Sequence, residues 1–213
     1  MRDAIRIPVA KHPNAMHVLR FCEGMLGLQR GVVELESYHD HWGERYRQEV
    51  KRLSTIAGDR LLACEHIGST AIRGMPAKPI LDIIGIVATE TDADGLVPLL
   101  ERHDYEYRSE NIDERIFLVK GPPTNRTVYL SLTELGSTFY EKTITFRDYL
   151  RDNPDDAAQY AALKKRLANT YPEERERYTA EKDHFIQHIL TKAKESSWHS
   201  STSYDNPSSN TAK

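Results

Sequence analysis

Apolar positions recur with the period of a helix in several parts of this chain. Between residues 38 and 57 they lie three and four apart, which predicts an amphipathic helix that ends at Gly58 and Asp59. The same pattern predicts helices over residues 91–102, 139–151, 154–169 and 172–193. Asn153 and Pro154 precede two acids, which is the usual order of residues where a helix begins. A mixed pattern over residues 15–28 predicts a short helix in an N-terminal extension.

Short apolar runs predict the strands. Residues 61–67 and 80–87 form two such runs, and the second is rich in β-branched residues. Residues 115–119 and 127–132 form two more, and the Gly-Pro-Pro segment between them predicts a hairpin. The strands lie in the first two thirds of the chain and helices fill the last third. The sequence therefore predicts an α+β fold, with a small mixed or antiparallel sheet flanked by helices and a C-terminal helical bundle.

The chain length suits one domain with appendages. Its 213 residues, 39% of them hydrophobic and 29% charged, provide a substantial core and a well-solvated surface. We expect an N-terminal extension over residues 1–30 and a main domain over residues 31–194. Residues 195–213 are mostly Ser, Asn, Thr and His without a period, which predicts a disordered tail.

Charge and cysteine content narrow the classes of function. The net charge of −3 creates no general attraction to nucleic acid or to anionic membranes, although a local basic patch remains compatible with it. No apolar run approaches the roughly 20 residues that span a bilayer, and the first residues lack a secretory signal. Cys22 and Cys64 lie far apart and form no ligand or redox motif. These features predict a reduced, cytoplasmic protein with a small-molecule substrate, and they leave the oligomeric state open.

The most informative segment spans residues 65–83. Asp82 lies in an apolar run, where a carboxylate has a desolvation cost of several kcal/mol that a metal ion or a nearby cation usually offsets. Thirteen residues earlier, the small residues of Gly68-Ser69-Thr70 leave backbone N–H groups accessible, as phosphate binding requires. The combination points towards nucleotide chemistry. The alternatives are that the turn is an ordinary helix cap and that Asp82 is a structural carboxylate paired with Arg73 or Lys78.

Five segments together resemble the GrpB family. They are EHIGSTA (65–71), AKPILDI (77–83), FRDYLR (146–151), YAALK (160–164) and YTAEK (178–182). The resemblance covers roughly residues 33–193, and its first two segments are the most specific. It implies the fold of the nucleotidyltransferase superfamily. The substrates of GrpB proteins are poorly defined, so the resemblance fixes the architecture better than the reaction.

The resemblance also implies where catalytic acids should lie. Nucleotidyltransferases place an acid-x-acid pair on the strand after the Gly-Ser turn and a third acid on a neighbouring strand. Asp82 matches the first acid, but Ile84 occupies the second position and residues 127–132 contain no acid. A two-metal mechanism needs several carboxylates. We therefore expect at most one Mg²⁺, held by Asp82, by Glu65 if it reaches the site, and by the phosphates of a nucleoside triphosphate.

The remaining candidates are substrate-binding residues, each with a structural alternative. The turn, the loop and the strand at residues 127–132 contribute His66, Gly68, Ser69, Thr70, Arg73, Lys78, Tyr129 and Ser131. The resemblance implies that the C-terminal helices add cations for a triphosphate, and these helices contribute Arg147, Lys164, Tyr178 and Lys182. Alternatively, His66 and Tyr129 are core residues and the Lys and Arg residues are solvated surface charges.

Three functions fit this pattern. The first is a nucleotidyltransferase-like enzyme that acts on a nucleotide and a small-molecule acceptor, with a reduced acidic metal site. The second is the same fold redirected to a different condensation, cyclisation or group transfer on a small metabolite, which the missing acids suggest. The third is a non-catalytic binding module.

Overall fold

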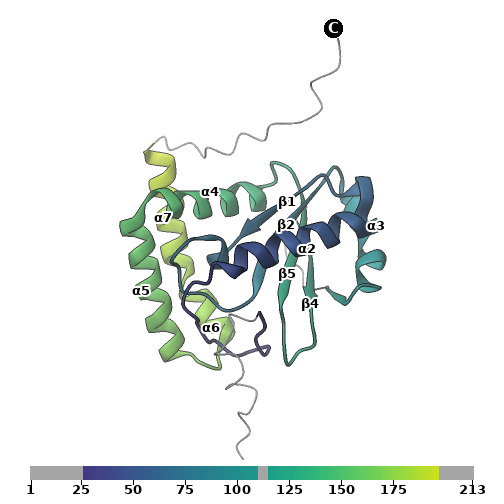
Figure 1. The fold of residues 1–213 in the computed structure, drawn as a ribbon. Helices are drawn as coiled ribbons and strands as arrows, with labels where there is room; N and C mark the ends of the chain where they lie inside the picture. The colour runs from purple at the N-terminus through teal and green to yellow at the C-terminus, as the bar shows by residue number, and fades with distance from the viewer. Residues whose placement is uncertain (1–25, 110–114, 197–213) are drawn as a thin grey trace, which may run out of the picture.

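A computed structural model describes residues 26–109 and 115–196 (Figure 1). The predicted C-terminal tail lies almost wholly outside these residues, as does most of the predicted helix over residues 15–28. The described end of that segment is not helical, because Leu28 forms an isolated β-bridge with Arg126. No helix in the described ranges is both long enough and apolar enough to cross a membrane.

Helices and strands occur in the predicted order, with one additional strand. The strands are β1 (Ala63–Ile67), β2 (Leu81–Val87), β3 (Tyr105–Arg108), β4 (Ile116–Lys120) and β5 (Val128–Glu134). The α-helices are α2 (His41–Ala57), α3 (Glu90–Glu101), α4 (Thr138–Asp152), α5 (Pro154–Thr170), α6 (Arg175–Ala180) and α7 (Asp183–Glu195). Two 3₁₀ turns, η1 (Gly58–Arg60) and η2 (Ser69–Ala71), flank β1.

The five strands form one mixed sheet in the order β1-β2-β5-β4-β3. β2 pairs with β5 in parallel, and the other neighbours are antiparallel. Asp82 on β2 therefore lies between Ile67 on β1 and Tyr129 on β5. The predicted α+β class, with a small mixed sheet flanked by helices, is confirmed.

Alternation along the strands divides the core between the two faces of the sheet. Ile83 and Leu130 point to the face covered by α2 and α3, where Leu96 is fully buried. Ile84 points to the opposite face and packs with Ile144 of α4. Asp82 shares the face of Ile84, because residues two apart on a strand point the same way. The other C-terminal helices lie beside α4 at one side of the sheet (Figure 1).

Two elements differ from the prediction. Strand β3 was missed because its sequence, YEYR, has no apolar run; it is an edge strand whose Glu106 and Tyr107 are exposed. The single helix predicted over residues 172–193 is instead α6 and α7, separated at residues 181–182. Tyr178 of α6 packs with Val33, whereas Ile189 of α7 packs in a different cluster beside α4. The chain forms two helices here, and each buries its apolar residues in a separate cluster.

Truncation of Leu96 should destabilise the fold because its side chain is fully buried between α3 and the sheet. We expect Leu96→Ala to lower the free energy of unfolding by about 2–5 kcal/mol, measured by urea denaturation. The matched control is Leu62→Ala, since Leu62 is 52% exposed. Equal losses in the two variants would contradict the assigned core.

Candidate functional site

The turn after β1 lies directly against Asp82. Gly68 has a φ of 69°, and a Cβ atom at this position would collide with Oδ2 of Asp82. Glycine is required here on both counts, because other residues disfavour this φ and have no space beside the carboxylate. Ser69 and Thr70 follow within η2. The structure thus brings the predicted turn and the predicted acid together.

The carboxylate of Asp82 has no direct partner in the part of the chain that the structure describes. It is partly exposed, and no described residue forms a hydrogen bond or an ion pair with it. Burial raises the pKa of Asp82, although nearby positive charges oppose this shift. These cations are, in order of effect, Lys78, Lys182, Arg175 and Arg115. One carboxylate therefore faces four cations without being sealed by any of them.

Two lysines share one aromatic ring beside this acid. The Nζ atoms of Lys78 and Lys182 lie 5.7 and 4.3 Å from the ring centroid of Tyr178. Burial, reinforced by neighbouring positive charge, lowers the pKa of both lysines to about 8. Arg175 lies on the same side, with its guanidinium 5.2 Å from the ring of Tyr129. None of these three cations forms an ion pair with a carboxylate in the described ranges.

Sequence reasoning missed the two arginines of this site. Arg175 lies in a run of alternating Glu and Arg that reads as a solvated helix face. Arg115 precedes β4, and its Nη1 donates a hydrogen bond of 2.9 Å to Oγ of Ser131. The predicted residue Ser131 thus contacts the site through an arginine. No spacing in the sequence distinguishes either arginine from a surface charge.

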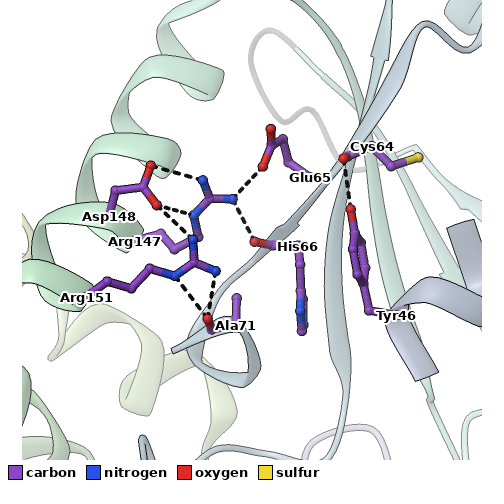
Figure 2. Close-up of polar contacts among 8 residues, drawn as sticks. All are labelled: Tyr46, Cys64, Glu65, His66, Ala71, Arg147, Asp148 and Arg151. Carbon is purple, nitrogen blue, oxygen red and sulfur yellow. Dashed lines mark hydrogen bonds and ion pairs between the residues drawn. The ribbon is translucent and has the colours of Figure 1, made fainter. Parts of the chain in front are cut away.

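Arg147 is a structural residue in this fold (Figure 2). It is 2% exposed and donates hydrogen bonds to Asp148, to Oε2 of Glu65 at 2.6 Å and to the carbonyl of His66 at 2.8 Å. The acid pair raises the pKa of Arg147 against the effect of burial. Arg151 extends the network to the carbonyl of Ala71. These contacts join α4 to β1 and to the turn, so the side chains of Glu65 and Arg147 are engaged with each other and with the scaffold.

His66 points to the opposite face of the sheet from Asp82. Its ring stacks on Tyr46 at 4.6 Å, and Nε2 lies 2.9 Å from Oγ1 of buried Thr70. Burial, with a smaller contribution from Arg151 and Arg147, lowers the pKa of His66 to about 3. A histidine that stays neutral in this way supports the turn from behind.

Lys164 contacts the backbone of a loop, and Arg73 lies at a separate surface. Lys164 is 2% exposed, and its ammonium group donates to the carbonyl of Pro76 and lies 5.4 Å from the ring of Tyr160. Burial lowers the pKa of Lys164; the charges of Lys182 and Lys78 add to this effect and that of Asp82 opposes it, so Lys164 also lies near the charges around Asp82. It anchors the loop that leads to Lys78. Arg73 is exposed and lines a separate cavity of about 520 Å³ between the turn and α5.

The predicted site residues therefore divide into two sets. Around Asp82 the structure gathers Gly68, Ser69, Lys78, Tyr129, Ser131, Tyr178 and Lys182. Scaffold contacts or a separate surface take up Glu65, His66, Thr70, Arg73, Arg147 and Lys164.

A divalent cation held by the protein alone does not fit this arrangement. Mg²⁺ requires oxygen ligands, usually including carboxylates. Asp82 supplies one carboxylate, Glu65 is bound to Arg147, and four cations face the same space. In the part of the chain that the structure describes, no three His, Cys, Asp or Glu residues are grouped as metal ligands.

Comparison with known families agrees with the sequence segments quoted above. The model of the family described as GrpB protein matches residues 32–192. The chain belongs to the GrpB family. A UPF0157 protein of Pseudomonas aeruginosa is 38% identical over 156 residues, which cover 71% of this chain and 64% of that protein. The chain thus spans less than two thirds of that relative.

Two further GrpB proteins match over more of their own length. The glutamate-rich protein GrpB of Alkalihalophilus pseudofirmus is 34% identical over 171 residues, which cover 78% of this chain and 98% of that protein. The crystal structure of the conserved protein GrpB from Enterococcus faecalis is similar with a TM-score of 0.71 at 35% identity. It covers 78% of this chain and all of the other. The described fold is therefore that of this family.

Removal of Arg147 should destabilise the fold strongly. Arg147→Met leaves the carboxylates of Glu65 and Asp148 without their shared cation, which costs about 3–5 kcal/mol when such a pair is buried. Urea denaturation measures this loss. The control Arg177→Met removes an exposed arginine paired with Glu174 and should leave the denaturation midpoint unchanged. A stable Arg147→Met variant would contradict the structural role.

Proposed function

We propose that this protein is an enzyme that binds a nucleotide through its phosphates and transfers a nucleotidyl group to a small-molecule acceptor. Lys78, Lys182 and Arg175 hold the phosphates. Asp82 orients the acceptor and takes its proton. The observation that supports this proposal most directly is the set of four cations near one carboxylate, with no second acid paired to them among the residues that the structure describes.

The geometry suits phosphate for two reasons. A triphosphate carries several negative charges, and partly buried cations without counter-ions bind such a group with little competition from the protein. Gly68 lets the backbone of the turn lie directly against the carboxylate of Asp82, because a Cβ atom at this position would collide with Oδ2. The chain also belongs to the GrpB family, and the resemblance to this family implied a nucleotidyltransferase fold.

The proposed step follows from these positions. The acceptor hydroxyl oxygen attacks the α-phosphorus, the bond between this phosphorus and the bridging oxygen breaks, and pyrophosphate leaves. The hydroxyl proton goes to Asp82, whose raised pKa makes it a stronger base than an ordinary aspartate. Lys78, Lys182 and Arg175 stabilise the charge that develops on the leaving group. Any Mg²⁺ would reach the site with the nucleotide, because the protein's own ligands do not suffice.

A second candidate is a metal-independent condensation or group transfer on a small anionic metabolite. The single carboxylate favours it, since Asp82 with cations on several sides is sufficient to bind an anion and accept a proton. Metal-independent turnover without release of pyrophosphate would favour this second reaction over the first.

Calorimetry with ATP, CTP, GTP and UTP, with and without Mg²⁺, tests the phosphate site. Lys182→Met should weaken binding by roughly 10- to 150-fold, the equivalent of a lost charge-assisted hydrogen bond of about 1.5–3 kcal/mol. Lys194→Met is the matched control, because Lys194 is an exposed lysine of α7. Equal affinity of the two variants, or no nucleotide binding by the unmodified protein, would refute the proposal.

Asp82→Asn separates the roles of charge and metal in the same experiment. Without Mg²⁺ the variant should bind nucleotide more tightly, by roughly tenfold, because a negative charge is removed from among the cations. Weaker binding of the variant in Mg²⁺ would instead show that Asp82 holds the ion.

Affinity for nucleotide should fall as the pH rises above 7. Lys78 and Lys182 have a pKa of about 8 in the free protein, so both are mostly charged at pH 7 and mostly neutral at pH 9.5. The phosphates of the ligand are already ionised over this range. Calorimetry should show a loss of at least roughly tenfold between these pH values, and a shallower profile for Lys182→Met. An affinity independent of pH would exclude these lysines as ligands.

A further inference from the structure

Arg115 is held in a way that leaves it available for a ligand. Its guanidinium carbon lies 4.2 Å from the ring centroid of Phe139 on α4 and 5.2 Å from that of Phe117 on β4. Nη1 donates to the neutral hydroxyl of Ser131, and Nε is buried with no hydrogen-bond partner. The two rings and the hydroxyl therefore fix the guanidinium, and no carboxylate of the described ranges pairs with its charge.

Structural arginines of this fold look different. Arg147 binds two carboxylates and a backbone carbonyl, and Arg126 binds Glu106 and the carbonyl of Gly121. Arg115 has no carboxylate partner in the described ranges. Burial lowers the pKa of Arg115, and the charge of Asp82 only partly offsets this effect. A partly buried arginine that has no paired acid in the described ranges is typical of a site that binds an anion.

Arg115 and Arg175 contact the sheet beside Asp82 at different positions along the strand direction. Arg175 contacts Tyr129, which pairs with Asp82 itself, and Lys78 precedes β2. Arg115 binds Ser131, which pairs with Ile84, two residues further along β2. Cations therefore flank the carboxylate from two directions on the same face of the sheet.

We infer that Arg115, held by Ser131, Phe117 and Phe139, binds an anionic group of the acceptor, so that the acceptor is a small molecule carrying a carboxylate or a phosphate. This inference rests on the proposed function, in which Lys78, Lys182 and Arg175 hold the phosphates of the nucleotide. Asp82 then lies between the two bound anions, beside the acceptor's reacting hydroxyl. The planar guanidinium suits either oxyanion, because both offer two oxygens to its parallel N–H donors.

Simultaneous binding of defined probes tests the inference. Inorganic triphosphate reports on the lysine site, and malonate and glycerol 3-phosphate report on the Arg115 site in its carboxylate and phosphate forms. Each probe is titrated by calorimetry into the full chain. Malonate and glycerol 3-phosphate are titrated into protein that is already saturated with triphosphate. We expect one of the two small probes to bind alongside triphosphate, and the one that binds identifies the acceptor group.

Variants assign the two sites. Arg115→Met should weaken the bound small probe by at least tenfold and change triphosphate affinity by less than about threefold, whereas Lys182→Met should do the reverse. If Arg115→Met weakens triphosphate as much as Lys182→Met does, the two sites are one and the inference is wrong. Failure of both small probes to bind, or an unchanged affinity in Arg115→Met, would also overturn it.

The test separates this inference from the proposed function. Absence of triphosphate binding refutes the proposed function. Even then, a small probe that binds the unmodified protein and not Arg115→Met supports the anion site at Arg115. Ser131→Ala serves if Arg115→Met does not fold, because it removes only the hydroxyl that orients Nη1. This variant should weaken the small probe several-fold, and no change would count against the inference.

Discussion

The excess of positive charge around Asp82 is the constraint on which the site depends. Four cations face one carboxylate, and none lies within ion-pair distance of it among the described residues. Burial lowers the pKa of Lys182 to about 8 and also lowers that of Arg115, whereas Arg147, also buried but paired with two acids, has a raised pKa. A bound polyanion would supply negative charge to balance these cations.

The scaffold that holds this imbalance is itself well compensated. Arg147 ties α4 to β1 through Glu65 and reaches the backbone of His66. The stacked, neutral His66 supports Thr70 from the other face of the sheet. The turn is therefore fixed on both sides, and the position of Gly68 against Asp82 follows from it. Arg147 and Arg151, which are paired with acids, build the frame, whereas the cations that we propose as ligand-binding residues have no carboxylate partner in the described ranges.

The sequence predicted what depends on local pattern. Asp82 and Gly68 became candidates because a lone acid in an apolar strand and a small-residue turn are rare. The helices up to α5 were predicted from periodic apolar positions, and four strands from short apolar runs. Strand β3 was missed because an exposed edge strand needs no apolar run. Arg115 and Arg175 were missed because an arginine's role depends on which acids surround it after folding. The same limit explains Glu65 and Arg147, whose ion pair joins residues that are 82 positions apart.

Lys164 and Lys182 show how far this limit extends. Both lie in C-terminal helical segments that resemble the GrpB family, and the resemblance implied phosphate binding for both, with solvated surface charge as the alternative. The break between α6 and α7 decides between them. It allows Tyr178 to pack with Val33 while α7 packs beside α4, and Lys182 occupies the corner that results, against the ring of Tyr178. Lys164, in the middle of α5, meets the carbonyl of Pro76 instead. The ammonium group of Lys164 thus has a backbone acceptor, whereas that of Lys182 has an aromatic face and no hydrogen-bond acceptor among the described residues, which is the condition that the proposed phosphate site requires.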